Sequence, residues 1–337
     1  MNVLIAVCGS PAIAPNLISM LRDIDYIENI VGIDINPDNA GRFLVDRYYK
    51  SLKTDSDDFI PFVKDVCIKE DIDIILCTST QNSLIPLKQV EKDFNKIGVK
   101  IPGVSIENLL VANDKGLMLD RISELNIPCP KYCTPKTEDD FDNFINETNN
   151  VIVKPRVSSG SRGFRILKRG YKNEDIFSKV EDNIIMDIEE YKRILVSKHN
   201  VDDIVMMEKL TGQDYSVYVL ANNGNPLVTI PFKRLNPKQG ISLISEVDLN
   251  NIVIDYANKI VKEMSLDWII NIQLFLNEEG IPLVYEINPR LAGSIILTKG
   301  AGCDLLKYGL DMISDKDLKI KKPKSCKMIR YYTEVLA

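Results

Sequence analysis

The segment Leu283–Arg290 combines residue types that can bind a metal ion and a phosphate group. Its pattern predicts a strand with Glu286 and Asn288 on one face, because side chains alternate along a strand. Pro289 ends the pairing and Arg290 follows. Carboxylate and amide oxygens suit Mg²⁺, and a guanidinium can neutralise a transferring phosphoryl group. The alternative interpretation is an ordinary antiparallel hairpin with polar residues on its solvent face.

A second strand is predicted immediately before this one. The run Trp268–Leu276 carries Gln273 near its centre, and Asn277–Gly280 forms the turn between the two strands. A hairpin of this kind places Gln273 across from Glu286. The sequence therefore predicts three oxygen ligands on two neighbouring strands.

A lysine and a flexible loop in the middle of the chain suggest a phosphate site. Lys154 lies near the end of a predicted strand over residues 150–155, and a Ser/Gly-rich loop follows over residues 157–163. Free N–H groups and small side chains allow such a loop to close over phosphates, and Arg162 adds positive charge. The loop lacks the Gly-Lys-Ser/Thr ending of a Walker A motif. A plain hairpin beside a chance lysine is the alternative.

Further residues have the chemistry that a nucleotide requires. Lys115 opens a predicted helix near a domain junction, and Glu208 ends a predicted strand next to Lys209 and Leu210. Adenine needs a backbone hinge and an acceptor for its exocyclic amine, and a ribose needs a carboxylate for its hydroxyls. Glu208 and Asp214 can meet these needs.

The elements that position these residues follow from hydrophobic patterning. Residues 1 to about 112 alternate between strands at 2–7, 30–35 and 72–77 and helices at 15–22 and 58–69, which predicts a parallel sheet. The first turn, Cys8–Pro11, lacks the glycine fingerprint of a dinucleotide site. Ser79, Thr80 and Gln81 follow the third strand, at the edge where such sheets bind ligands.

Further along the chain we expect helices at 115–125, 141–147 and 250–264, helical parts within 171–198, strands at 164–167, 203–210 and 215–221, and a turn at 222–225.

Composition excludes several classes of function. The 337 residues are 45% hydrophobic and 27% charged, with a net charge of −6, which disfavours nucleic-acid binding. The sequence shows neither a signal peptide nor a stretch able to span a bilayer, so we expect a cytoplasmic protein. The seven cysteines are scattered and are expected to be reduced thiols. The single histidine, His199, has no nucleophile motif nearby, which argues against a Ser-His-Asp mechanism.

The ordered set of these residues resembles the ATP-grasp superfamily. It is most similar to the ATP-binding halves of the carbamoyl-phosphate synthetase large subunit, where the metal ligands are also a Gln followed by Glu-x-Asn. Ala112–Lys115 followed by Asn126–Pro130 is also typical of the family. Two departures are Asp214, where a glutamate is usual, and the serine-rich loop with Arg162.

The resemblance implies a fold and a domain division. The fold is α/β and α+β: an N-terminal Rossmann-like parallel-sheet domain that precedes the ATP-grasp unit (1–112), a small central lid (113–207) and a C-terminal antiparallel-sheet domain with the metal ligands (208–337).

The resemblance also implies cofactors and roles for individual residues. ATP and Mg²⁺ (or Mn²⁺) are the expected cofactors. Lys115 and Lys154 would hold phosphates, with Lys154 and Arg290 as the catalytic residues, and Gln273, Glu286 and Asn288 would hold the metal. The nucleotide would further contact the loop at Ser159, Gly160 and Ser161 and the residues Glu208, Lys209, Leu210 and Asp214.

Family members activate a carboxylate as an acyl phosphate, which an amine then attacks. The chain is therefore expected to be a carboxylate–amine ligase for amino acids or small peptides, with a homodimer as the family-level expectation. Arg162, Arg234, Gly293 and Ser294 are the candidate substrate residues. The alternatives are a carboxylase-like or carboxyphosphate-forming enzyme, an ATP-binding module without turnover, and a dehydrogenase.

Overall fold

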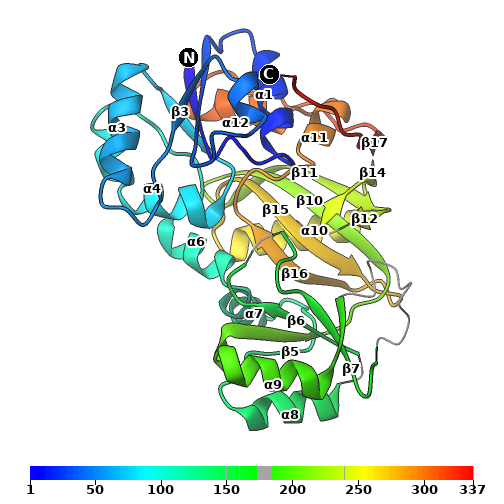
Figure 1. Cartoon of the computed structure of the whole chain (residues 1–337). Coiled ribbons are helices and arrows are strands. Elements are labelled where there is room, and N and C mark those ends of the chain that lie inside the picture. The colour runs from blue at the N-terminus through cyan, green and yellow to red at the C-terminus, as the bar shows by residue number, and fades with distance from the viewer. Residues whose placement is uncertain (149, 159, 173–183, 239, 337) are drawn as a thin grey trace. The chain divides into compact units, whose positions relative to one another are not determined.

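A computed structural model describes residues 1–148, 150–158, 160–172, 184–238 and 240–336 (Figure 1). These residues divide into two compact units. The first unit comprises Met1–Leu110, Asp214–Gln273 and Ile287–Ala337, and the second comprises Val111–Gln213 and Leu274–Glu286. The three domains predicted from the sequence remain a prediction, because this two-way division does not test their boundaries.

The first unit contains a four-stranded parallel sheet with the order β3-β2-β1-β4. Strands β1 (Asn2–Ala6), β2 (Asn29–Asp34) and β4 (Ile74–Cys77) match the predicted strands. They are buried almost throughout because they are continuous apolar runs covered by helices. The sequence reading missed the edge strand β3 (Arg47–Lys50), whose residues are only partly buried or exposed.

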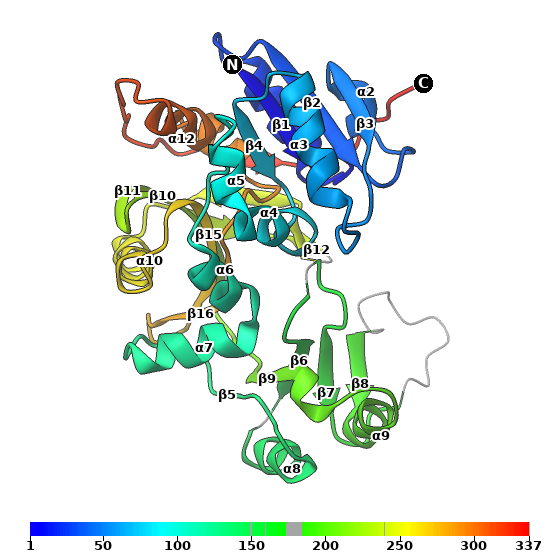
Figure 2. The same ribbon diagram turned by 90° about the vertical axis from the view of Figure 1, so that its left-hand side faces the viewer.

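Helices cover this sheet. Figure 2 shows α3 (Phe59–Lys69) lying across one face. Helix α1 (Ala14–Arg22) starts with a proline in its first turn, a position that proline favours. The remaining elements of this part are α2 (Gly41–Leu44), the π-helical turn η1 (Thr80–Leu84), α4 (Ile85–Gln89), α5 (Glu91–Asn95) and α6 (Ile106–Asn113).

A six-stranded sheet has the order β16-β15-β10-β11-β14-β17. Strands β10 (Gln213–Asn222) and β11 (Asn225–Arg234) form an antiparallel hairpin, as predicted from the turn at 222–225. The other members are β14 (Ile244–Val247), β15 (Trp268–Leu276), β16 (Pro282–Asn288) and β17 (Lys327–Ile329). Helix α10 (Asn251–Glu263) is capped by Asn250, and α11 (Ile296–Gly300), α12 (Leu305–Ile313), β12 (Pro237–Lys238) and β13 (Ile241–Ser242) complete this part.

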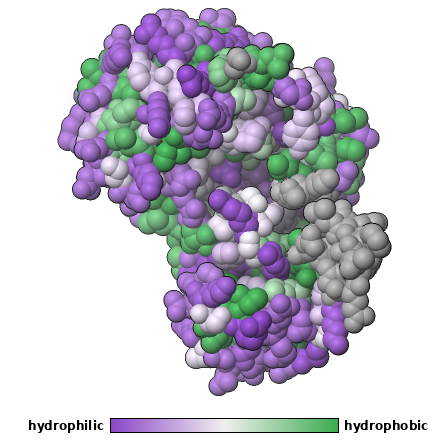
Figure 3. All heavy atoms as spheres, viewed as in Figure 1, coloured by the Kyte–Doolittle hydropathy of each residue, from purple (hydrophilic) through white to green (hydrophobic). Residues whose placement is uncertain are grey.

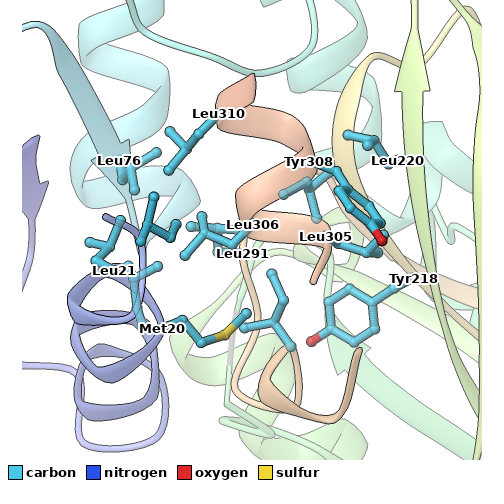
Figure 4. Close-up of a cluster of buried hydrophobic side chains, with 14 of the residues drawn as sticks. Met20, Leu21, Leu76, Tyr218, Leu220, Leu291, Leu305, Leu306, Tyr308 and Leu310 are labelled. Atoms are coloured by element: carbon cyan, nitrogen blue, oxygen red, sulfur yellow. The ribbon is translucent and has the colours of Figure 1, made fainter. Parts of the chain in front are cut away.

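One hydrophobic core joins the elements of the first unit. It includes residues of α1, β4, β10 and α12, among them Leu21, Leu76, Leu220 and Leu306 (Figure 4). Tyr218 of β10 and Tyr308 of α12 take part with their rings. The N-terminal parallel sheet and the six-stranded sheet therefore share buried contacts within one unit.

The second unit contains a five-stranded mixed sheet with the order β5-β9-β6-β7-β8. Its strands are β5 (Tyr132–Cys133), β6 (Val151–Pro155), β7 (Arg165–Lys168), β8 (Ile185–Asp187) and β9 (Ile204–Glu208). Helices α8 (Glu138–Glu147) and α9 (Ile188–Lys198) bury Phe141, Phe144 and Leu195 against it. Helix α7 (Lys115–Glu124), the short 3₁₀ turn η3 (Val201–Asp203) and residues 274–286 also belong to this unit.

The surface is polar over most of the face that Figure 3 shows, with hydrophobic residues in small groups. Among the helices formed by the described residues, none combines the length and the apolar character needed to cross a bilayer.

Candidate nucleotide and metal site

Lys115 lies in a buried position at the start of α7. Asp114 caps the helix, and its carboxylate accepts hydrogen bonds from the N–H groups of Gly116 and Leu117. The Nζ of Lys115 donates to the carbonyl oxygen of Ser158 at 2.8 Å and lies 3.8 Å from Oε1 of Glu286. The second unit thus brings together the predicted phosphate lysine, the base of the predicted loop and one predicted metal ligand.

Burial sets the ionisation of Lys115. Removal from water lowers the pKa of its ammonium, and the nearby carboxylates of Glu286 and Asp114 partly oppose this shift. The lowered pKa reflects the position of Lys115, which is only 5% exposed.

Arg156 connects the start of α7 to the end of β6. The sequence did not predict this role. Its guanidinium contacts both carboxylate oxygens of Asp114, with Nε at 3.0 Å and Nη2 at 2.8 Å. The backbone N–H of Lys115 donates to the carbonyl oxygen of Arg156 at 3.0 Å. A bidentate pair of this kind is geometrically specific, so Lys115 and Lys154 are held on adjoining elements.

The side chain of Lys154, on β6, lies near two aromatic rings. Its Nζ lies 4.7 Å from the ring centroid of Tyr285 and 5.8 Å from that of Phe164. A ring face attracts an ammonium without neutralising its charge. Lys154 therefore lies beside β16, at the position of Tyr285, which precedes Glu286 in that strand.

The predicted phosphate loop follows β6. Gly160, Ser161 and Arg162 are exposed, whereas Ser159 lies outside the described residues. Gly160, Ser161 and Gly163 have φ values of 68°, 56° and 74°. At Gly163 a Cβ atom would lie 2.5 Å from Cγ of Pro155. The turn therefore requires glycine at Gly163 for both conformation and space.

The predicted adenosine residues lie at the end of β9. Oε1 of Glu208 accepts a hydrogen bond from the N–H of Lys131 at 2.8 Å, and the N–H of Lys209 donates to the carbonyl oxygen of Asn150. Leu210 is half-buried and Lys209 is exposed. The backbone after β9 is thus held in place, and the predicted adenine contacts remain a prediction.

In the first unit, Asp214 and Gln273 lie near the same guanidinium. Arg234 donates from Nη1 to Oδ2 of Asp214 at 3.0 Å and to Oε1 of Gln273 at 3.4 Å. Its Nε and Nη2 donate to Ser242 Oγ and to the carbonyl oxygen of Gly240. The predicted carboxylate-binding role of Arg234 stays a prediction, but this buried arginine donates to at least four acceptors among the described residues.

Arg290 lies at the end of β16, as predicted. Its Nη2 donates to Oδ1 of Asn288 at 3.3 Å, and its Nη1 donates to the carbonyl oxygen of Leu291 at 2.8 Å. The predicted arginine and one predicted metal ligand therefore adjoin each other in the first unit.

The predicted substrate residues Gly293 and Ser294 lie near Arg290, together with Tyr218 and Arg330. Ser294 Oγ lies 3.1 Å from the hydroxyl of Tyr218, and Nη2 of Arg330 donates to the carbonyl oxygen of Gly293 at 2.8 Å. Burial raises the pKa of Tyr218 to about 12, and the cations Arg290 and Arg330 oppose this shift. At Gly293 a Cβ atom would lie 2.5 Å from the carbonyl oxygen of Ala12, so a larger residue does not fit.

The sequence reading missed Tyr218 and Arg330. Tyr218 occupies an ordinary strand position, and Arg330 follows a lysine-rich stretch that carries no motif. Arg330 reaches this group because β17 pairs with β14.

The chemistry of the predicted metal ligands suits a hard divalent cation. Gln273 lies on β15, and Glu286 and Asn288 lie two residues apart on one face of the neighbouring strand β16. One carboxylate and two amide oxygens fit Mg²⁺ or Mn²⁺ and lack the nitrogen and sulfur donors that Zn²⁺ prefers. Within the described parts of the chain, no cluster of three or more His, Cys, Asp or Glu offers a competing site.

The chain combines a parallel sheet, a mixed sheet that carries Lys154, and neighbouring strands that carry Gln273 and Glu286-x-Asn288, an arrangement that resembles ATP-grasp proteins. The family described as "ATP-grasp in the biosynthetic pathway with Ter operon" matches residues 200–335. The predicted resemblance to the ATP-grasp superfamily, and within it to carbamoyl-phosphate synthetases, is confirmed.

Curated relatives cover two thirds of the chain. The chain is 24% identical to the carbamoyl phosphate synthase large chain of Clostridium acetobutylicum over 234 residues. The aligned segment covers 66% of this chain and 21% of that protein. The large chain of a Thermoanaerobacter species is 26% identical over 238 residues, 66% of this chain and 20% of that protein. The chain thus matches about a fifth of the length of these relatives.

Solved structures confirm the predicted fold. The ADP complex of the N5-carboxyaminoimidazole ribonucleotide synthetase purK has a TM-score of 0.73 at 14% identity, covering 97% of this chain and 81% of that one. The biotin carboxylase domain of Hydrogenobacter thermophilus 2-oxoglutarate carboxylase, in complex with MgADP, ADP and bicarbonate, has a TM-score of 0.70 at 14% identity, covering 96% and 71%.

Proposed function

We propose that this protein is an ATP-dependent ligase that joins a small-molecule carboxylate, such as an amino acid or short peptide, to an amine. The observation that carries the proposal is the contact of Lys115 with both the phosphate loop and Glu286. A buried lysine between a glycine-containing loop and a carboxylate on an oxygen-rich strand suits a site for a metal-bound polyphosphate.

The reaction would proceed in two steps. A carboxylate oxygen attacks the γ-phosphorus of ATP and ADP leaves, which gives an acyl phosphate. The amine nitrogen then attacks the carbonyl carbon, phosphate leaves, and the nitrogen loses a proton. Lys115 and Lys154 would hold the phosphates, and the loop at residues 158–163 would exclude the water that otherwise hydrolyses the acyl phosphate.

The groups around Arg290 would bind the carboxylate. Arg290 and Arg330 provide positive charge, and the hydroxyls of Tyr218 and Ser294 provide hydrogen bonds beside them. Such preorganised groups stabilise negative charge as it develops on the reacting oxygens. Gln273, Glu286 and Asn288 would hold Mg²⁺, which supplies charge neutralisation for the phosphates when bound.

A second candidate is an enzyme that forms carboxyphosphate from bicarbonate. The bicarbonate bound to the 2-oxoglutarate carboxylase domain of similar fold favours this candidate. In this alternative the same cationic group would receive bicarbonate in place of an organic carboxylate. Either way, we propose a cytoplasmic enzyme with small-molecule partners, and a homodimer remains the family-level expectation.

The deciding experiment measures ADP release from MgATP with pooled carboxylates and pooled amines, followed by mass detection of the condensed product. Glu286→Gln should lose on the order of 10²-fold in rate, because it removes a preorganised charged group. Bicarbonate-dependent ADP release without any amine would favour the second candidate. Binding of ATP without ADP release in any pool would indicate that the protein is an ATP-binding module without turnover.

A further inference from the structure

Arg234 occupies the buried centre of a polar group in the first unit. Its side chain is 6% exposed and that of its ion-pair partner Asp214 is 13% exposed, with 3.0 Å between Nη1 and Oδ2. Ser242 Oγ, itself buried, accepts from Nε at 2.8 Å, and the Gly240 carbonyl oxygen accepts from Nη2 at 2.9 Å. The planar guanidinium is therefore fixed on several sides.

The contact of Arg234 with Gln273 determines which end of the Gln273 amide faces it. A guanidinium has only donors, so the amide must turn its oxygen rather than its NH₂ towards Nη1. The observed atom is Oε1, at 3.4 Å. Since only the oxygen of an amide binds a hard cation, the same orientation presents the ligand end of Gln273. An amide oxygen has two lone pairs, so it can accept from a guanidinium and also bind a cation.

The charges in this group offset each other. A guanidinium beside a cation site would repel the cation unless a negative charge accompanied it. Asp214 supplies that charge, and the register of β10 and β11 explains why Asp214 lies next to Arg234. Tyr215 pairs with Lys233, so Asp214 and Arg234 continue the same ladder on the same face of the sheet.

We propose that Arg234 is a positioning residue for the metal ligand Gln273, with Asp214 as its counter-charge. This inference rests on the proposed function, because it requires Gln273 to bind the divalent cation. It assigns Arg234 an action through Gln273 instead of the contact with substrate that the sequence predicts. Positioning groups behind metal ligands contribute about 10- to 100-fold to metal affinity.

The test compares metal affinity with nucleotide affinity in the full-length protein. Mn²⁺ binding in the presence of ADP is measured by electron paramagnetic resonance, and ADP binding in EDTA by calorimetry. Arg234→Lys keeps the charge beside Asp214 but loses the rigid fork. We expect Mn²⁺ affinity to fall roughly 10- to 100-fold, while ADP affinity in EDTA stays at the wild-type value.

A double-mutant cycle shows whether Arg234 acts through Gln273. In a Gln273→Ala background, Arg234→Lys should cause no further loss of Mn²⁺ affinity, because the residue it orients is gone. Ser242→Ala removes one anchor of the guanidinium and should weaken Mn²⁺ binding in the same direction. This milder variant decides the question if Arg234→Lys does not fold.

A matched control lies one position away on β11. Lys233 forms an ion pair with Asp248 at 3.0 Å on the opposite face of the strand, so Lys233→Met should leave Mn²⁺ and ADP binding unchanged. Additive losses in the cycle, an equal loss of ADP affinity in EDTA, or wild-type Mn²⁺ affinity in the folded variants would overturn the inference. Failure of the wild-type protein to bind Mn²⁺ with ADP would instead overturn the proposed function.

Discussion

At the scale of single residues, the two predicted phosphate lysines have different surroundings. Lys115 is buried against a carbonyl oxygen and a carboxylate, whereas Lys154 faces the rings of Tyr285 and Phe164. A carboxylate partner competes with a phosphate for an ammonium, but an aromatic ring orients the ammonium and leaves its charge in place. We therefore expect the ring of Tyr285 to contribute to the position of Lys154.

Replacing Tyr285 tests this dependence. Tyr285→Leu should weaken MgADP binding about 2- to 30-fold, because a cation–π contact contributes about 0.5–2 kcal/mol. Tyr285→Phe keeps the ring and should bind MgADP like the wild-type protein in calorimetry. If both variants are equally weak, the hydroxyl rather than the ring supports the site.

The cysteines provide a second residue-scale prediction. Burial raises the pKa of Cys8, Cys67 and Cys77 to about 12, so at pH 8 only about one thiol in 10⁴ is the reactive thiolate. These three should resist iodoacetamide in the native protein, while the half-buried Cys326 reacts first. Mass spectrometry of native and urea-unfolded samples measures the difference. Rapid native labelling of Cys77 would contradict the prediction.

At the scale of elements, Gly212 lies in the connection between β9 and β10. It has a φ of 107°, and a Cβ atom there would lie 2.2 Å from the carbonyl oxygen of Leu276. Gly212→Ala should lower the free energy of unfolding by on the order of 3 kcal/mol, because the strained φ alone costs about 1–2 kcal/mol and the backbone must also move. Urea unfolding measures the loss.

Gly280 provides the matched control for Gly212. Its φ is 77°, but nothing lies within 4 Å of the position that a Cβ atom would take there. Gly280→Ala should therefore cost only the conformational part, about 1 kcal/mol. Equal losses in the two variants would mean that the close approach to Leu276 contributes nothing.

The sequence predicted most elements because their patterns are local. The apolar runs of β1, β2 and β4 and the turn of the β10–β11 hairpin, where Asn223 and Gly224 have φ values of 51° and 75°, follow from neighbouring residues alone. Strand β3 escaped prediction because an edge strand of four partly exposed residues has no buried face to create a pattern.

The positions of the candidate site residues were predictable where one strand or one loop carries them. The shared face of Glu286 and Asn288 follows from alternation within β16, and Arg290 follows Pro289 directly after the strand. The ion pair of Arg156 with Asp114, the hydrogen bond of Tyr218 with Ser294 and the contact of Arg330 with Gly293 join residues 42, 76 and 37 positions apart. Such pairs depend on tertiary packing, which a single sequence does not display. Arg234 was singled out as a cation, but its internal partners were not foreseeable.

At the scale of the whole molecule, the first unit is held together by a core drawn from distant parts of the chain. Leu306 of α12 is fully buried in the same cluster as Leu21, Leu76 and Leu220. The N-terminal parallel sheet and the six-stranded sheet of this unit therefore bury apolar surface against common side chains. We expect their stabilities to be coupled.

Leu306→Ala tests this coupling. Removing the side chain leaves a cavity in the shared core and should cost about 2–5 kcal/mol. Hydrogen exchange followed by mass spectrometry should show faster exchange in β1 and in β11 together. Leu227→Ala, at a position 38% exposed on β11, is the control and should change little. If β1 keeps its protection while β11 loses it, residues 1–112 form the independent domain predicted from the sequence. Loss of protection in both would mean that the predicted boundary near residue 112 separates segments that unfold as one.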